Sequence, residues 1–111
     1  MGTLKPGDGI QIGTFDKKHP LARGFVNLFE GDTICSWNKP FPDYKVFAMQ
    51  TDPKNLPVIF YKEASGSNPR ILMDCAFTKL YRQYYNKDVE RYLSNAACWL
   101  NNLDNDIDLS N

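Results

Sequence analysis

The sequence is poor in the residues that mark metalloenzymes and disulfide-rich proteins. It has one histidine, His19, and three cysteines, Cys35, Cys75 and Cys98, which lie far apart and form no CxxC motif. Zinc sites need three or four His, Cys or carboxylate ligands, and a disulfide framework needs an even number of cysteines. We therefore expect no metal site and no cofactor. We expect the cysteines to be buried free thiols in a reducing compartment, the cytoplasm.

A strong charge of one sign is also missing. The 111 residues carry 13 basic and 13 acidic side chains, which gives a net charge of zero at pH 7. Without an excess of positive charge, the chain has no global field that attracts nucleic acid or anionic lipid. No apolar stretch approaches the roughly 20 residues that span a bilayer. We therefore expect no membrane association, and nucleic acid is not a favoured partner.

The chain does contain enough apolar material for one small core. Hydrophobic residues make up 42 % of the sequence and aromatic residues 14 %. A chain of this length buries roughly two thirds of its extended surface on folding. We expect a single domain over residues 1–111, with its core within residues 9–103 and a frayed acidic tail over residues 104–111.

Short apolar runs separated by turn residues predict a small sheet. The predicted strands cover residues 32–37, 45–51, 57–61 and 70–77, after a short extended segment at 9–13. The connections between these runs are too short for the crossover that parallel pairing needs, so the sheet should be largely antiparallel. The turn at residues 65–69 predicts a hairpin between the last two strands.

Two further segments have helical spacing. Pro20 opens at most one helical turn that Gly24 closes, and Phe25, Leu28 and Phe29 are spaced as a further turn that faces the core. Residues 88–103 carry the apolar stripe of an amphipathic helix, formed by Val89, Tyr92, Leu93, Ala96, Leu100 and Leu103. Asn86 or Asp88 is its predicted N-cap.

These elements predict an α/β layer, or more strictly an α+β fold within this chain. The sheet should be small and mostly antiparallel, with about four strands, and the final helix should pack on one of its faces. We expect Ile71 and Met73 in the last strand to pack together with Leu93, Ala96 and Leu100 on the helix.

Three side chains are candidates for chemistry. His19 is the only imidazole, and it is either a base or a turn residue before Pro20. Asp74 interrupts an apolar strand, so its carboxylate must be paired, hydrogen-bonded or at the edge of the sheet. A structural role, with a donor such as Thr78, is favoured over catalysis. Glu30 lies at a bend before a strand, where it could orient a substrate. No positioned nucleophile accompanies them, so we expect no catalytic residue in this chain.

An aromatic and basic segment at residues 77–85 is the candidate binding surface. Its residues that could contact a partner are Lys79, Tyr81, Arg82, Tyr84 and Tyr85. This composition can stack on single-stranded nucleic acid, and it can also form a protein interface, where tyrosine and arginine are enriched. The balanced net charge favours the protein interface.

The order of several short motifs resembles a known family. The motifs are His19-Pro20-Leu21-Ala22-Arg23-Gly24, Glu30-Gly31-Asp32, Arg70-Ile71-Leu72-Met73-Asp74 and Ala97-Cys98-Trp99-Leu100. Together they resemble the C-terminal half of class I glutamine-amidotransferase-like domains, most closely the ThuA-like domains found alongside von Willebrand A domains. The resemblance covers roughly residues 9–103. It implies half of a flavodoxin-like domain, which is either part of a longer protein or completes its sheet by dimerising.

The chain departs from that family at the positions of its chemistry. It lacks the parallel βα units with the nucleophile elbow, and Ala76-Phe77-Thr78 stands where amidotransferases carry a histidine. The resemblance therefore implies a non-catalytic interaction or ligand-sensing module of an amidotransferase-like assembly, with a protein partner or a homodimer. One alternative is a hydrolase or amidotransferase-like enzyme whose nucleophile lies on another segment, with His19, Glu30 and Asp74 lining the site. The other is a weak nucleic-acid-binding module.

Overall fold

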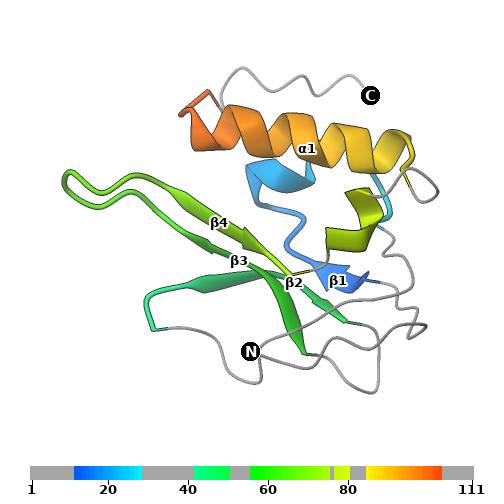
Figure 1. The fold of residues 1–111 in the computed structure, drawn as a ribbon, viewed down its shortest axis with the longest axis horizontal. Coiled ribbons are helices and arrows are strands. Elements are labelled where there is room, and N and C mark those ends of the chain that lie inside the picture. The colour runs from blue at the N-terminus through cyan, green and yellow to red at the C-terminus, as the bar shows by residue number, and fades with distance from the viewer. Residues whose placement is uncertain (1–11, 29–41, 51–55, 76, 81–84, 104–111) are drawn as a thin grey trace.

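In the part of the chain that the structure describes, the fold is a four-stranded antiparallel sheet with one α-helix across one of its faces (Figure 1). The computed structural model describes residues 12–28, 42–50, 56–75, 77–80 and 85–103. In chain order its elements are β1 (Ile12–Phe15), the 3₁₀ helix η1 (Pro20–Ala22), β2 (Lys45–Gln50), β3 (Pro57–Lys62), β4 (Ile71–Asp74), the 3₁₀ helix η2 (Phe77–Leu80) and α1 (Lys87–Leu100). The strands are ordered β1-β2-β3-β4 and every neighbouring pair is antiparallel. The predicted α+β architecture is confirmed.

The central strands lie close to their predicted positions, and the outer strands differ. β4 ends at Asp74, earlier than expected, and the chain turns into η2 at residues that the apolar run had assigned to the strand. The turn brings Lys79 beneath the Asp74 carboxylate, an ion pair that a straight strand would not allow. β1 begins at Ile12 and continues to Phe15, beyond the extended segment predicted at 9–13. Residues 9–11 and the predicted strand 32–37 lie outside the described residues.

The hairpin between β3 and β4 forms as its turn residues predict. The register runs from Ile59 opposite Asp74 to Lys62 opposite Ile71. Beyond the strands, Ser65 and Asn68 exchange backbone hydrogen bonds, which closes the tight turn. Gly66 within it has a φ of +58°, a conformation that glycine adopts without steric cost.

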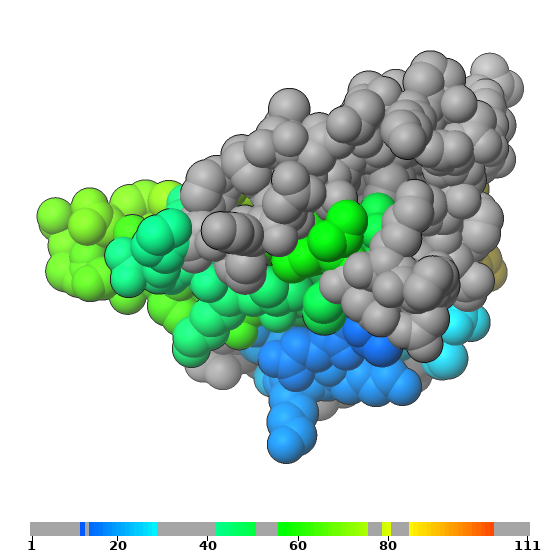
Figure 2. All heavy atoms as spheres, turned by 90° about the horizontal axis from the view of Figure 1, so that it is seen from below, coloured from blue at the N-terminus to red at the C-terminus, as the bar shows by residue number. Residues whose placement is uncertain are grey.

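Side chains on the two faces of the sheet form two clusters of unequal size. The larger cluster lies between the sheet and α1, and it includes Phe47, Ile59 and Tyr61. On the opposite face Phe60 and Cys75 are buried, and the partly buried Tyr44, Val46 and Met73 pack against them. Figure 2 shows this second side of the molecule, where β2 and the β3–β4 hairpin reach the surface.

The helix follows its sequence signals at its N-terminus. Asn86 is the N-cap, and its side-chain oxygen accepts a hydrogen bond from the backbone N–H of Val89 at 2.9 Å. Asp88 and Glu90 lie in the first turn, where negative charge is favourable because the helix dipole is positive there. At the other end Asn101 is the C-cap, so α1 ends at Leu100, three residues before the end of the predicted segment.

The buried face of α1 is rotated from the predicted stripe. It consists of Val89, Tyr92, Asn95, Ala96 and Trp99. Leu93 is only partly buried, while Leu100 and Leu103 are 41 % and 48 % exposed. The helix turns its two large aromatic rings inward, because these bury the most apolar area.

The expected packing of the last strand against that stripe is therefore wrong. Ile71 is 36 % exposed, and Met73 packs with Phe60 on the face of the sheet away from α1. Alternate residues of a strand point to opposite faces. On β4 it is Leu72 and Asp74 that point towards the helix.

The first connection after β1 confirms one predicted turn and corrects another. Pro20 begins η1, and Gly24 follows with a φ of +85°. Phe25 and Leu28 are buried as predicted, but residues 25–28 form no helix. Phe29 lies outside the described residues.

Candidate functional site

The side chains proposed from the sequence fall into two separate places. His19 lies beside Trp99 near the C-terminal end of α1, and Asp74 contacts Tyr92 nearer to its N-terminus. Trp99 and Tyr92 are seven residues apart, so these contact points are separated by about 10 Å along the helix axis. Glu30 lies outside the described residues, as do Tyr81, Arg82 and Tyr84. The structure therefore does not join His19 and Asp74 into one acid–base pair.

His19 is enclosed by aromatic rings. Its imidazole centroid lies 4.3 Å from that of Tyr61, 5.2 Å from that of Trp99 and 5.8 Å from that of Phe47. These rings come from β3, α1 and β2, so His19 fills the junction of three elements. Only 7 % of the residue is exposed. A base in this position is shielded from any substrate in solution.

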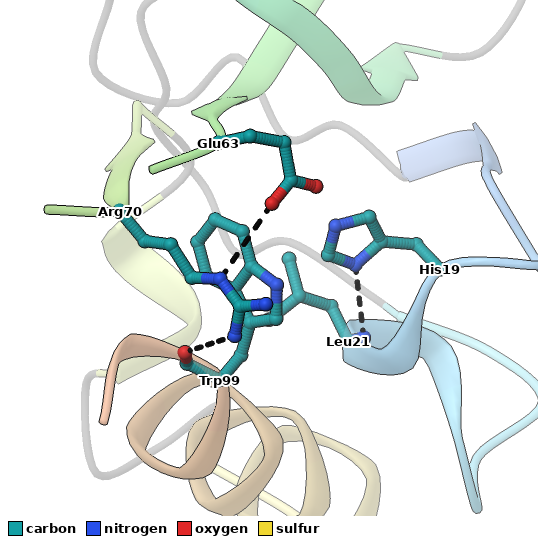
Figure 3. Close-up of polar contacts among 5 residues, drawn as sticks. All are labelled: His19, Leu21, Glu63, Arg70 and Trp99. Atoms are coloured by element: carbon teal, nitrogen blue, oxygen red, sulfur yellow. Dashed lines mark hydrogen bonds and ion pairs between the residues drawn. The ribbon is translucent and has the colours of Figure 1, made fainter. Parts of the chain in front are cut away.

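The imidazole also has a defined role in the backbone. His19 is the N-cap of η1, and its Nδ1 accepts a hydrogen bond from the backbone N–H of Leu21 at 3.1 Å (Figure 3). An N-cap side chain satisfies one of the N–H groups that have no partner within the helix. Because an accepting Nδ1 carries no proton, the neutral ring in this geometry has its proton on Nε2. The sequence had left His19 open between a base and a turn residue, and the geometry favours the turn residue.

Next to His19, Arg70 links the hairpin to the end of α1. Its Nη1 donates to the carbonyl of Trp99 at 2.8 Å, and its guanidinium lies 4.9 Å from the Trp99 ring centroid. Its Nε lies 3.6 Å from a carboxylate oxygen of Glu63 across the base of the hairpin (Figure 3). The last turn of α1 contains no basic residue of its own. Arg70 therefore supplies the positive charge that the negative end of the helix dipole favours.

The phenol of Tyr61 in this cluster is harder to ionise than a free tyrosine. Burial raises its pKa above the usual value of 10.0, and the negative charges of Asp16 and Glu63 raise the pKa further. Both effects oppose a phenolate, since each disfavours additional negative charge. Tyr61 is therefore protonated at neutral pH and is not a nucleophile or a base there.

Asp74 is bound by the side chains of Lys79 and Tyr92. Lys79 Nζ lies 2.8 Å from Oδ1 and 2.7 Å from Oδ2, and the Tyr92 hydroxyl donates to Oδ2 at 2.8 Å. The Lys79 side chain is fully buried, and its ammonium group lies 5.4 Å from the Tyr92 ring centroid. The structural role predicted for Asp74 agrees with this geometry. The side chain of Thr78, the donor named from the sequence, is outside the described set.

The same ion pair removes Lys79 from the binding surface predicted at residues 77–85. Lys79 was a candidate for contact with a partner, but its charge is neutralised inside the protein. Lysine is almost never fully buried unless it is paired, which is why the sequence alone suggested an exposed residue. Tyr85 is 43 % exposed, and Leu80, which the sequence did not single out, is 47 % exposed.

The sequence also did not reveal the side-chain contacts that Tyr92, Arg70 and Glu63 make. Tyr92 was assigned to the apolar stripe, and nothing in the sequence placed its hydroxyl beside Asp74. Glu63 and Arg70 carry opposite charges on the two sides of the predicted hairpin turn, and this is the signal that could have paired them across the hairpin.

Among the described side chains, no group of three His, Cys, Asp or Glu residues is placed to hold a metal ion. Cys75 and Cys98 are free thiols, the first buried and the second partly buried, while Cys35 is outside the described residues. No helix in the described part of the chain is long and apolar enough to cross a membrane. Searches of family models, curated proteins and solved structures give no significant match to this chain.

A hollow of about 500 Å³ lies along the first half of α1. Its lining residues are Gly24, Lys87, Asp88, Glu90, Arg91 and Ser94. None of them is a residue that the sequence singled out for chemistry. The wall carries two positive and two negative side chains, so the hollow has no charge preference that would select an ionic ligand.

Proposed function

We propose that this chain is a non-catalytic protein-interaction module of the ThuA-like type, acting within a larger amidotransferase-like assembly. Its resemblance to that family through the motifs around His19, Arg70 and Trp99 supports the proposal. The chemistry of the described candidates supports it as well. His19 caps η1, and Asp74 is bound by Lys79 and Tyr92, so both have structural tasks.

The observation that carries the proposal is the exposure of two large side chains, Leu80 and Tyr85, which precede and follow residues 81–84 in the sequence. Leu80 at the end of η2 is 47 % exposed, and Tyr85 just before α1 is 43 % exposed. Lys79, next to Leu80, is anchored inside by its ion pair with Asp74. A fixed anchor beside exposed apolar area is a favourable arrangement for binding, because less side-chain freedom is lost when a partner docks.

A protein partner fits this surface better than a nucleic acid. Binding to single strands needs cations along the backbone path as well as aromatic platforms. The charge of Lys79 is already used within the fold. Tyrosine, by contrast, is enriched among the residues that dominate protein–protein binding energy.

The partner that can be tested without further components is a second copy of the chain. A two-fold dimer uses one patch on both subunits, so a single apolar surface is enough to close it. The proposed module is then intracellular, where the free thiols Cys75 and Cys98 stay reduced.

Light scattering over a wide range of protein concentrations tests this proposal. We expect the weight-average mass to rise with concentration, and Leu80→Glu to lower the association constant at least tenfold. Val26→Glu is the matched control, because Val26 is apolar and 76 % exposed but lies after η1, outside the proposed surface. A chain that stays monomeric at every concentration, or an equal loss in both variants, contradicts the proposal.

The enzyme alternative has its own test. If the chain contributes to hydrolysis, His19→Asn should abolish turnover of glutamine or of an activated ester by the wild-type chain. We expect no turnover from the wild-type chain at all. Measurable hydrolysis that disappears in this variant would replace the proposed function with the enzyme.

A further inference from the structure

We infer that His19 is a pH-sensitive latch, whose protonation releases η1 from its cap and loosens the contact between η1 and α1. His19 is the only histidine in the chain, so no other side chain has an unperturbed titration between pH 5 and 8. The inference concerns the fold itself. It does not depend on the partner proposed above.

The cap requires a lone pair on Nδ1. The backbone N–H of Leu21 donates to this atom at 3.1 Å, within a residue that is only 7 % exposed. An imidazolium carries protons on both nitrogens and can only donate. Protonation at Nδ1 therefore removes the acceptor and places two N–H groups against each other.

Loss of the hydrogen bond between His19 and Leu21 affects α1 because α1 is bonded to backbone carbonyl groups of η1 and of Arg23, the residue after it. Asn95 Nδ2 donates to the carbonyl of Leu21 at 3.0 Å and to that of Arg23 at 2.6 Å. Arg91 Nε donates to the same Arg23 carbonyl at 3.2 Å. These bonds need the backbone geometry that the His19 cap holds. A displaced imidazole therefore weakens the attachment of η1 to the helix.

The charged groups around the imidazole come from several elements. β1 is followed by Asp16, whose carbonyl accepts the backbone N–H of His19 at 3.2 Å. On the sheet, the neutral Tyr61 phenol and, opposite it in register, Lys45 lie on the same face. The hairpin contributes Glu63 and Arg70, which form an ion pair with each other. From α1 the uncharged ring of Trp99 packs against the imidazole.

The balance of these groups favours release over a stable buried cation. Glu63 and Asp16 attract an imidazolium, but Arg70 already lies 3.6 Å from the Glu63 carboxylate. That ion pair limits how strongly Glu63 can stabilise an imidazolium that stays in the position capping η1. Two arrangements of one side chain result, a neutral capping form and a charged displaced form.

The pH dependence of stability follows from linkage. In the unfolded chain a histidine is half protonated at about pH 6.5, while the capped form takes up no proton at Nδ1. The unfolded state therefore binds more protons, so stability rises with pH and falls on acidification. At pH 5.5 the unfolded imidazole is about ten parts protonated to one part neutral, so acidification raises the unfolding equilibrium constant by at most about tenfold, and by less where the charged displaced form of the folded protein is populated.

Urea titrations of wild type and His19→Asn between pH 8 and pH 5.5 test the latch. Asparagine keeps an acceptor oxygen at the cap but does not titrate in this range. We expect the unfolding equilibrium constant of wild type to rise more than that of His19→Asn over this interval, by at most about tenfold. Parallel curves for the two proteins would overturn the inference.

A second measurement on the wild-type protein covers the case in which His19→Asn does not fold. The ¹⁵N chemical shifts of the imidazole report which nitrogen carries the proton. At pH 8 we expect an unprotonated Nδ1, and on acidification we expect the Leu21 amide signal to shift together with protonation of the ring. A protonated Nδ1 at pH 8, or a Leu21 signal that does not respond to ring protonation, would contradict the latch.

Discussion

The core beneath α1 contains polar groups at both of its ends, and the two ends satisfy them differently. At the end near Trp99, His19 is neutral and bonds to the backbone of Leu21. At the end near Tyr92, Asp74 and Lys79 are an ion pair whose lysine side chain has no exposed surface. One end uses local hydrogen bonds to the chain, and the other uses charges brought together by a turn after β4.

This difference has energetic consequences. When a substitution leaves a buried neutral group without its hydrogen bond, the protein loses about 1–3 kcal/mol of stability. When a substitution leaves a buried charge without a counter-charge, the loss is several kcal/mol. The ionic end should therefore tolerate single substitutions poorly and coordinated double substitutions well. The neutral end should respond moderately to single substitutions and more strongly to pH.

Asp74→Asn should have the largest effect, because it removes the negative charge that Asp74 places 2.7 Å from the buried Lys79 ammonium. Asparagine still accepts from the Tyr92 hydroxyl, so the change isolates the charge. We expect a loss of about 3 kcal/mol or more in the free energy of unfolding, measured by urea titration. The double variant Asp74→Asn with Lys79→Met should recover much of this loss. A double variant as unstable as the single one would show that the ion pair is not the cause.

Tyr92→Phe should come next, because it removes the hydroxyl that donates to Asp74 while keeping the buried ring. Hydrogen bonds to charged groups contribute about 1.5–3 kcal/mol, so we expect a loss in that range. The effect should be much smaller in the background of Asp74→Leu, where the acceptor is absent. Equal losses in both backgrounds would place the effect in ring packing.

Asn95→Ala tests the neutral end. It removes the amide that donates to the carbonyls of Leu21 and Arg23, the second of which keeps its bond from Arg91. We expect a loss of about 1–2 kcal/mol. The loss should appear together with faster amide exchange in residues 20–23. Ser94→Ala, on the exposed face of the same helix, is the control and should change stability little.

The smallest effect should appear only in alkali. Because the pKa of Tyr61 is raised in the folded protein, its contribution to stability is complete below about pH 10 and is lost as the pH rises through the folded value. Stability should therefore fall more steeply between pH 9 and pH 11 in wild type than in Tyr61→Phe. In a titration of the folded protein followed by absorbance at 295 nm, the variant should lack one of the tyrosines that ionise at high pH in wild type. Identical alkaline profiles would contradict this assignment.

Local signals in the sequence predict much of the fold. Short apolar runs located β2 and β3, the turn around Gly66 predicted the hairpin, and Asn86 marked the start of α1. Each of these features depends on residues within a few positions of one another. Sequence periodicity is reliable for such features because the relevant partners are neighbours in the chain.

The rotation of α1 could not be predicted in the same way. Two apolar stripes compete on this helix, one through Leu93 and Leu100 and the other through Tyr92, Ala96 and Trp99, and both have helical spacing. The choice depends on what lies opposite, namely η1 and the ring of Phe47. Both are more than 40 residues away in the chain, so periodicity carries no information about them.

The candidate site was predicted only in part, again because its contacts join residues that are far apart in the chain. The sequence showed that Asp74 needs a partner, since a carboxylate in an apolar strand is costly to bury alone. It did not show which partner, because the Tyr92 hydroxyl lies 18 residues further along the chain. Lys79 was misjudged, since composition alone gives a lysine among tyrosines the character of a surface residue.

The hydrogen bond between Asn95 and the carbonyl of Leu21 also constrains the order in which this protein can fold on the ribosome. These residues are 74 positions apart in the chain, while the hairpin of β3 and β4 pairs residues close together. Loop closure over such a distance is slow compared with formation of a hairpin. At a synthesis rate of about 5–20 residues per second, Asn95 is synthesised about 4–15 s after Leu21. During that interval η1 has no helix to cover it.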